Sequence, residues 1–249
     1  LSLHDALPIS NLVHSLLESW WNTPEPLIPQ EWRDAWMFFL PKPGKPSTHP
    51  SHLRPIALME PIGKLVLGLL TEQLKSFHLQ RLCCQPHFGF LPLRGALDAV
   101  TRVVAHCRGI RTLIAMQKRT VARQMATRPL YTFCGGLQMF LDLKHAFDSV
   151  NRPLLFDHLK DLHTPHPLLH LISSWHVGTR YNLVHNGRTT SVNVDTGLRQ
   201  GCKAAPLLWV LFMNRFLQIL MDKVGQQWIV ENVTLYADDI HVGASFFSN

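Results

Sequence analysis

Three aspartates stand where apolar runs of the sequence end or turn. Asp142 ends an apolar run, and Asp238 and Asp239 separate the apolar segments 233–236 and 240–242. A buried carboxylate is costly unless it is paired or bound to a metal ion. Carboxylate oxygens are also the ligands that Mg²⁺ takes together with substrate phosphates. The aspartates therefore predict a site for divalent cations, where two ions would activate a hydroxyl nucleophile and stabilise a leaving pyrophosphate.

Each of these features also has an ordinary structural explanation. An Asp-Asp pair between two strands is more often part of a turn. An aspartate at the end of a strand often caps the next helix. Only the two features together favour metal chemistry. Asp148, six residues after Asp142, is expected to cap the turn that follows it.

The elements that must position these residues follow from apolar periodicity and turn signals. Strands are expected at 36–40, 53–59, 138–143 (a buried strand), 182–185, 189–194, 233–236 and 240–242, with a hairpin at Asn186-Gly187. Helices are expected at 11–21, 61–82, 96–106, 153–162, 167–175 and 205–224. Their irregular alternation predicts an α+β fold.

The charge balance favours an anionic partner. The 249 residues include 24 Lys and Arg against 17 Asp and Glu, a net charge of +7, which indicates nucleic acid before an acidic membrane surface. Residues 99–141 contain no acid, and either a basic helix or a loose insertion fits them. Two interpretations of these residues are contact with a nucleic-acid backbone and a solvated positive face. No apolar run reaches the roughly 20 residues of a membrane span, so no membrane partner is expected.

The cysteines and the first residues give weaker signals. Five cysteines without a C-x-x-C pair indicate reduced thiols of an intracellular protein rather than a zinc cluster. Residues 1–10 lack the basic start and the apolar core of a signal peptide. They are interpreted as a boundary or non-native segment.

Six segments, in order, resemble the motifs of reverse transcriptases of non-LTR retrotransposons, with the group II intron enzymes as relatives. Tyr236-Ala-Asp-Asp239 is similar to the palm motif of that family, and Ala146-Phe-Asp148 to its first aspartate motif. The segments are 40–45, 53–57, 85–94, 140–150, 197–202 and 236–239, within a resemblance that covers about residues 30–245.

This resemblance implies a right-hand polymerase fold with an antiparallel palm sheet. Residues 11–135 would form the fingers, with a basic insertion near 102–128, and residues 136–249 would form the palm. The chain ends ten residues after Asp239. The thumb is therefore expected to be missing, and the chain to be a fragment.

The resemblance also implies roles for single residues. The catalytic residues would be Asp142, Asp238 and Asp239, and the metal ligands Asp142, the Leu143 carbonyl and Asp238. The nucleotide would be bound by Arg54, Phe147, Gln200, Gly201 and Lys45, and the template by Arg94, Arg119 and Arg123. Phe147 would act as an aromatic gate against a 2′-hydroxyl. For Lys42 and Lys45 a solvated basic turn is an equal explanation.

The implied function is RNA-directed DNA synthesis with two Mg²⁺ ions, or Mn²⁺ in their place. Its partners would be an RNA template, a DNA primer and dNTPs, and target-primed insertion would require the nucleus. A catalytically silent RNA-binding remnant of a retroelement is the alternative. A viral RNA-dependent RNA polymerase is disfavoured by Ala237, where those enzymes typically have Gly, and by the aromatic Phe147.

Overall fold

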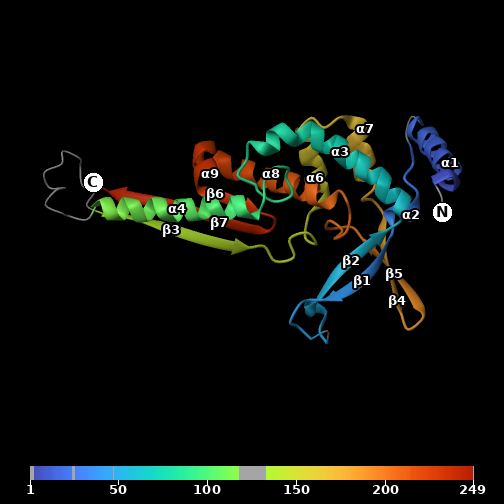
Figure 1. Ribbon diagram of the computed structural model, residues 1–249, viewed down its shortest axis with the longest axis horizontal. Helices are drawn as coiled ribbons and strands as arrows, with labels where there is room; N and C mark the ends of the chain where they lie inside the picture. The colour runs from blue at the N-terminus through green and yellow to red at the C-terminus, as the bar shows by residue number, and fades with distance from the viewer. Residues whose placement is uncertain (1–2, 24–25, 47, 118–132, 249) are drawn as a thin grey trace.

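The computed structural model describes residues 3–23, 26–46, 48–117 and 133–248, which form two β-sheets joined by helices (Figure 1). The helices are α1 (Leu3–Trp21), α2 (Gln30–Arg33), α3 (Pro61–Cys83), α4 (Ala96–Gln117), α6 (Arg152–Asp161), α7 (His166–Ser174), α8 (Ala205–Val224) and α9 (Gln226–Asn232), with a 3₁₀ turn at Pro50–His52. The strands are β1 (Ala35–Pro41), β2 (Leu53–Met59), β3 (Phe133–Asp142), β4 (Thr179–His185), β5 (Arg188–Val194), β6 (Val233–Tyr236) and β7 (Asp239–Ser248). The sheets have the strand orders β2-β1-β4-β5 and β3-β7-β6. The predicted α+β class is confirmed.

The four-stranded sheet is built from two hairpins. β1 pairs with β2 in antiparallel register along its whole length. β4 and β5 form the second hairpin around Asn186 and Gly187, whose φ angles of 50° and 73° suit a two-residue type I′ turn. β1 and β4 run parallel and join the hairpins at Ala35 and Trp36. The hairpin at Asn186-Gly187 agrees with the sequence prediction, as do the strands expected at 36–40 and 53–59.

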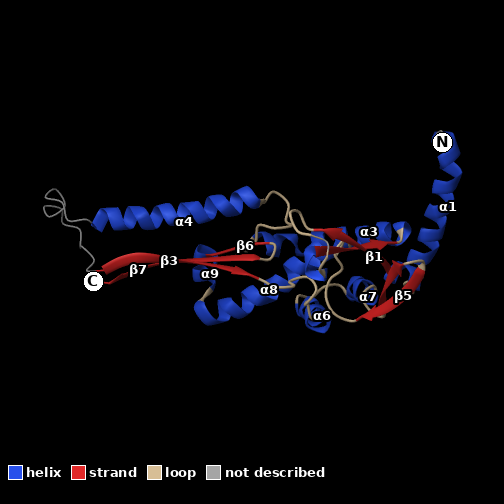
Figure 2. Cartoon of the chain, turned by 90° about the horizontal axis from the view of Figure 1, so that it is seen from below, coloured by secondary structure: helices blue, strands red, loops and turns tan. Residues whose placement is uncertain are grey.

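The three-stranded sheet has β7 at its centre, with β3 and β6 paired antiparallel on either side. Figure 2 shows α4 on one side of this sheet and α8 and α9 on the other. The expected burial of the strand at 138–143 is wrong, because Met139 and Phe140 of β3 are 42% and 70% exposed. An edge strand has a neighbour on one side only.

The core lies where α3, α6, α7 and α8 pack together. Leucines at helical spacing supply its fully buried side chains, among them Leu67, Leu70 and Leu74 of α3, and each contributes about 1.5–3 kcal/mol by its burial. Trp175, which follows α7, is also fully buried and stacks on Trp32 with ring centroids 5.7 Å apart. The two sheets are thus connected through this helical core.

Some bounds differ from the sequence prediction. α1 begins at Leu3, within the segment 1–10, and α4 continues to Gln117 instead of ending at 106. Residues 118–132, which include the later part of the basic insertion, lie outside the described residues. The proposed boundary at 135/136 places β1 and β2 in one part and their sheet partners β4 and β5 in the other. The division into fingers and palm stays a prediction.

Within the described ranges, no helix combines the length and the hydropathy needed to span a bilayer.

Candidate active site

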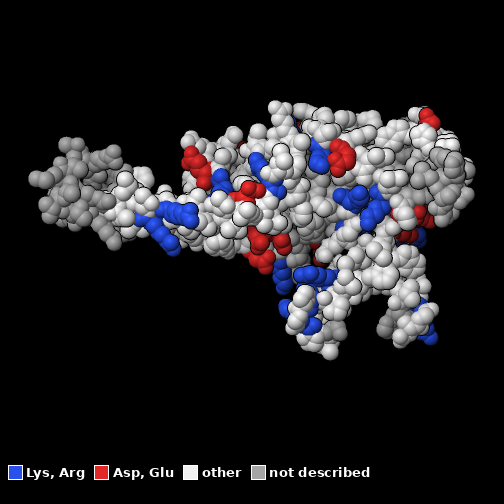
Figure 3. All heavy atoms as spheres, in the orientation of Figure 1, with Lys and Arg blue, Asp and Glu red and all other residues white. Residues whose placement is uncertain are grey.

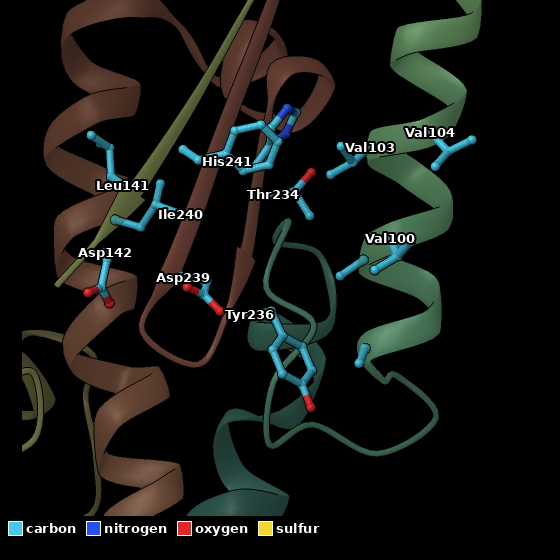
Figure 4. A pocket seen from close by; sticks show the side chains of 13 residues that line it. Val100, Val103, Val104, Leu141, Asp142, Thr234, Tyr236, Asp239, Ile240 and His241 are labelled. Atoms are coloured by element: carbon cyan, nitrogen blue, oxygen red, sulfur yellow. The ribbon is translucent and has the colours of Figure 1, made fainter. Parts of the chain in front are cut away.

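The three aspartates meet at one end of the three-stranded sheet. Asp142, the last residue of β3, lies opposite Asp239, the first residue of β7 (Figure 4). Residues directly opposite each other in an antiparallel pair have Cα atoms about 4.5–5.5 Å apart. Asp238 lies in the two-residue turn between β6 and β7. The sheet thus brings together carboxylates from two distant parts of the sequence.

The turn that carries Asp238 is held by two other parts of the chain. Ala237 has a φ of 52°, and its carbonyl accepts a hydrogen bond of 2.9 Å from the indole of Trp209 in α8. The backbone at Gly89 approaches so closely that a Cβ there would lie 2.5 Å from the Ala237 nitrogen. Glycine is required at position 89 because any side chain would collide with backbone.

Residues 86–88 pair with β6 directly beside this turn. The Leu235 amide donates to the Pro86 carbonyl, and the Phe88 amide donates to the Leu235 carbonyl, each at 2.8 Å. The segment 85–94, which the sequence singled out as a motif, therefore supports the strand that leads to Asp238.

Arg94 holds this supporting segment in place. Its half-buried guanidinium donates to the carbonyls of Gln85 at 2.5 Å and His87 at 2.8 Å, and also to the carbonyl of Cys83. These bonds aim the guanidinium at the chain's own backbone. Contact between Arg94 and the template stays a prediction.

A cavity of about 650 Å³ lies beside the aspartates. Six residues with a predicted role line it: Arg54, Asp142, Leu143, Phe147, Gln200 and Asp238. Figure 3 shows acidic side chains gathered over the ends of β3, β6 and β7, next to basic side chains on the β1–β2 hairpin. Acidic and basic side chains border the same cavity, so the cavity suits a ligand that carries phosphates together with cations.

Phe147 is packed from two directions. Its ring stacks on Trp209 with centroids 5.1 Å apart and meets Phe90 edge-on at 6.1 Å. The Phe147 carbonyl accepts a hydrogen bond of 2.7 Å from the Leu198 amide. The ring therefore has little freedom to move away from the cavity that it lines. Its action as a sugar gate stays a prediction.

Gln200 and Gly201 differ in their placement. Gln200 lines the cavity, and its carbonyl accepts a hydrogen bond of 2.8 Å from Ala57 of β2. Gly201 has a φ of 104°, and a Cβ there would lie 2.5 Å from the Ala57 carbonyl oxygen. Glycine is required at 201 because the loop presses against β2. Gly201 is not among the described residues that line the cavity.

The remaining predicted basic residues lie elsewhere. Lys45 is exposed in the turn between β1 and β2, where its amide donates to the Lys42 carbonyl at 3.1 Å; Lys42 itself lines the cavity. Arg119 and Arg123 lie outside the described residues. The roles assigned to Lys45 and to the two arginines stay predictions.

The carboxylates are more exposed than the sequence suggested. Asp142 and Asp239 are exposed and Asp238 is half-buried, because β3 is an edge strand and the turn projects from the sheet. The ion pairs found between described residues do not involve these three aspartates. Among all residues that the structure describes, no cluster of three or more His, Cys, Asp or Glu side chains is arranged to hold a metal.

The donor set nevertheless suits a hard cation that binds with its substrate. Asp142 and Asp238, which carry carboxylates, line one cavity together with Leu143. Mg²⁺ is commonly held by one or two carboxylates together with substrate phosphates and water. The residues therefore fit Mg²⁺ as a shared ligand of the chain and a polyphosphate.

Three residues that shape this site lie outside the set predicted from the sequence. Lys144 and His145 line the cavity between the motif residues Asp142 and Phe147, and their place inside that motif was a usable signal. Trp209 supports both Ala237 and Phe147. Asp148, which was expected to cap the turn that follows it, lines the cavity. The N-cap of the next helix is Asn151.

A second, apolar cavity of about 690 Å³ lies between α4 and the three-stranded sheet. Figure 4 shows Val100 and Val103 of α4 directed toward the sheet, with Asp142 and Asp239 at the end where the strands finish. Asp142 lines both cavities. The aspartates therefore stand between a polar space and an apolar one.

Comparison with known proteins places the chain among relatives of one kind. A family model described as reverse transcriptase (RNA-dependent DNA polymerase) matches residues 40–247. A probable RNA-directed DNA polymerase from transposon X-element of Drosophila melanogaster is 27% identical over 217 residues, and the RNA-directed DNA polymerase from mobile element jockey of Drosophila funebris is 28% identical over 206 residues. These alignments cover 86% and 81% of this chain but 21% and 20% of the relatives. The chain thus spans about a fifth of their length.

Solved structures share the fold at low sequence identity. Telomerase from Candida albicans, in complex with a fragment of telomeric RNA, superposes with a TM-score of 0.54 and 9% identity, covering 94% of this chain and 42% of that one. A Candida tropicalis telomerase gives a TM-score of 0.53 and 10% identity, covering 95% of this chain and 40% of that one. The family match includes every residue placed above in the polar cavity. This chain belongs to the reverse transcriptase (RNA-dependent DNA polymerase) family and is related to the enzymes of non-LTR retrotransposons.

Proposed function

We propose that the polar cavity is the nucleotide-addition site of an RNA-directed DNA polymerase encoded by a retroelement. One observation carries the proposal: Asp142 and Asp238, from distant segments, line one cavity together with Arg54, Phe147 and Gln200. This is the set of residues that nucleotidyl transfer requires, namely cation ligands, a phosphate-binding cation and groups that contact a nucleoside.

In this proposal each residue performs one task. Asp142, Asp238 and the Leu143 carbonyl would hold two Mg²⁺ ions, which supply activation of a primer 3′-hydroxyl and charge neutralisation on pyrophosphate. The planar guanidinium of Arg54 suits a phosphate group better than a lysine would. Phe147, backed by Trp209 and Phe90, would exclude a ribose 2′-hydroxyl. Gln200 would lie against the nucleotide.

The wider arrangement belongs to the same proposal. The four-stranded sheet would serve as part of the fingers and the three-stranded sheet as the palm. An RNA template, a DNA primer and dNTPs would be the partners, and the nucleus the place of action. These assignments concern a whole protein, whereas this chain spans about a fifth of the length of the curated relatives.

Asp238→Asn tests the proposal with the least change in shape. On an RNA template with an annealed DNA primer, dNTPs and Mg²⁺, we expect extension by the wild-type chain. The variant should be slower by about a thousandfold, the equivalent of about 4 kcal/mol of transition-state stabilisation. Asp222→Asn is the matched control, because Asp222 is exposed on α8 and does not line the cavity. Equal extension by Asp238→Asn and wild type would overturn the assignment.

A non-catalytic RNA-binding remnant is the second candidate. The exposed Arg108 and Arg111 on α4 favour it, because they precede the basic residues that follow α4. Binding of this kind would weaken steeply with salt and would not respond to Mg²⁺ or dNTPs. RNA affinity that increases with a matched dNTP and Mg²⁺ would exclude it.

A further inference from the structure

Arg152 is a buried cation that forms no ion pair with the described acidic side chains. It is the first residue of α6 and only 4% exposed. Burial lowers its pKa; Tyr181 and Asp195 oppose this effect, and Arg199 adds to it. Burying a charge is expensive unless hydrogen bonds compensate for the lost water. The contacts of this guanidinium therefore indicate what it contributes to the fold.

The Arg152 guanidinium gathers backbone from several segments. It donates to the carbonyls of Gly197 at 2.8 Å, His176 at 2.6 Å and Val194 at 2.8 Å, and to the Thr179 hydroxyl at 3.2 Å. These acceptors lie after α7, at the start of β4, at the end of β5 and in the loop that begins at Gly197. One side chain thereby links the second hairpin of the four-stranded sheet to that loop.

The loop from Gly197 to Gly201 connects this link to the cavity. The Gly197 amide donates to the Val150 carbonyl at 2.9 Å, and the Leu198 amide donates to the Phe147 carbonyl at 2.7 Å. A Cβ at Gly197 would lie 2.5 Å from the Asp148 carbonyl oxygen. The loop is therefore pressed against the chain segment that carries Phe147, and Gln200 at its other end faces the same cavity.

We propose that Arg152 is a positioning residue that fixes Phe147 and Gln200 relative to each other and so sets the fit of the nucleotide sugar in the cavity. The proposal rests on the function proposed above. It adds a determinant of sugar selectivity that does not itself line the cavity. Arg152 acts through the loop at Gly197 rather than by touching the substrate.

Arg152→Lys tests this role because lysine keeps the charge but lacks the planar fork that reaches several carbonyls. In single-nucleotide extension we expect the preference for a dNTP over the matching rNTP to fall by about tenfold, with a raised KM for the dNTP. The ratio of the two nucleotides does not depend on how much of the enzyme is folded. If Arg152 had only a structural role, the variant would give less folded protein but would keep the wild-type preference for the dNTP over the rNTP. That result would overturn the proposal.

Two further variants guard against loss of folding as an explanation. Thr179→Val removes one acceptor of Arg152 and should shift the ratio in the same direction by a smaller factor. Arg102→Lys is the matched control, because Arg102 is a partly buried arginine that donates to the carbonyls of Val230 and Val233 and to the Thr234 hydroxyl. It bonds to no residue of the Gly197 loop, so its variant should keep the wild-type ratio. An equal loss of selectivity in Arg102→Lys would count against the proposal.

Hydrogen exchange separates this proposal from the proposed function. If the wild-type chain does not extend a primer, the proposed function fails for this chain, and the exchange of the Gly197 and Leu198 amides then decides the positioning role. Faster exchange in Arg152→Lys, confined to residues 197–201 and the segment of Phe147, supports it. Unchanged exchange at these amides, or faster exchange across the whole chain, overturns it.

Discussion

Gly89 shows how a residue without a side chain supports the aspartate turn. Its backbone lies against Ala237, and a Cβ would come within 2.5 Å of the Ala237 nitrogen. Because the obstacle is backbone, it cannot move without shifting Asp238. We expect Gly89→Ala to lower the free energy of unfolding by about 1–3 kcal/mol and to reduce primer extension. Urea denaturation and an extension assay measure the two effects.

Gly109→Ala is the control for this substitution. Gly109 lies within α4, and a Cβ there would meet nothing within 4 Å. Alanine is preferred over glycine inside a helix, so this variant should be more stable than wild type by about 0.5–1 kcal/mol. Unchanged stability in Gly89→Ala would mean that the backbone at 89 does not press on the turn.

Single residues of the candidate site were predictable where their role depends on a local motif. Asp142, Phe147, Gln200 and Asp238 were named from short segments and all line one cavity. Gly201 was expected at the nucleotide, yet its glycine is explained by the approach to Ala57 in β2. That approach joins residues far apart in the sequence, and no local pattern reveals it.

The elements show the same division between local and distant causes. The predicted bounds 53–59, 205–224 and 233–236 match β2, α8 and β6, because turn residues and apolar periodicity within each segment define them. The burial of β3 was mispredicted although the strand itself was expected. Whether an apolar strand lies at the centre or the edge of a sheet depends on its partners, and among the described strands β3 pairs with β7 alone.

The exposed edge of β3 predicts self-association of this element. β3 pairs with β7 on one side, and Leu137 and Met139 are 61% and 42% exposed. Long apolar edge strands pair readily with other chains, and a lysine on the edge opposes this. We expect Leu137→Lys to reduce concentration-dependent light scattering while changing the free energy of unfolding by less than about 0.5 kcal/mol.

A buried position in the same sheet provides the contrast for that variant. Val233 of β6 is 1% exposed, so Val233→Lys should unfold the sheet rather than improve solubility. If Leu137→Lys scatters light as strongly as wild type at every concentration, the edge of β3 is not the site of association.

At the scale of the whole molecule, three of the histidines that the fold buries have pKa values far below the ordinary one. His78 and His87 are each 1% exposed and His176 is 2% exposed. Burial is the main cause that lowers the pKa of His78 and His87 to about 4 and that of His176 to about 3. Arg94 beside His87 and Arg199 beside His176 act in the same direction. The three side chains lie in different parts of the fold, so their protonation lowers the stability of the whole fold and not of one element.

These histidines predict that the fold weakens in mild acid. Each pKa is lower in the folded chain than the unfolded value of about 6.5, so below that pH the unfolded chain binds protons first. The stability present above about pH 6.5 is therefore lost as the pH falls toward 4, with about 2 kcal/mol per histidine lost at pH 5. Three such losses are comparable with the whole stability of a domain, about 5–15 kcal/mol. Urea denaturation at pH 7.5, 6 and 5 measures the decline.

Removing one histidine should remove its share of this pH dependence. His87→Gln keeps a polar side chain behind the aspartate turn but cannot take up a proton in this range. The difference in unfolding free energy between pH 7.5 and pH 5 should therefore shrink by about 2 kcal/mol relative to wild type. Asp34, whose pKa is lowered by its bonds to Arg180 and Gln30 against the opposing effect of burial, titrates below this window and does not obscure the comparison. Identical pH profiles for wild type and His87→Gln would show that His87 is already accessible to protons in the folded chain, and that the segment behind Asp238 is more open than its packing indicates.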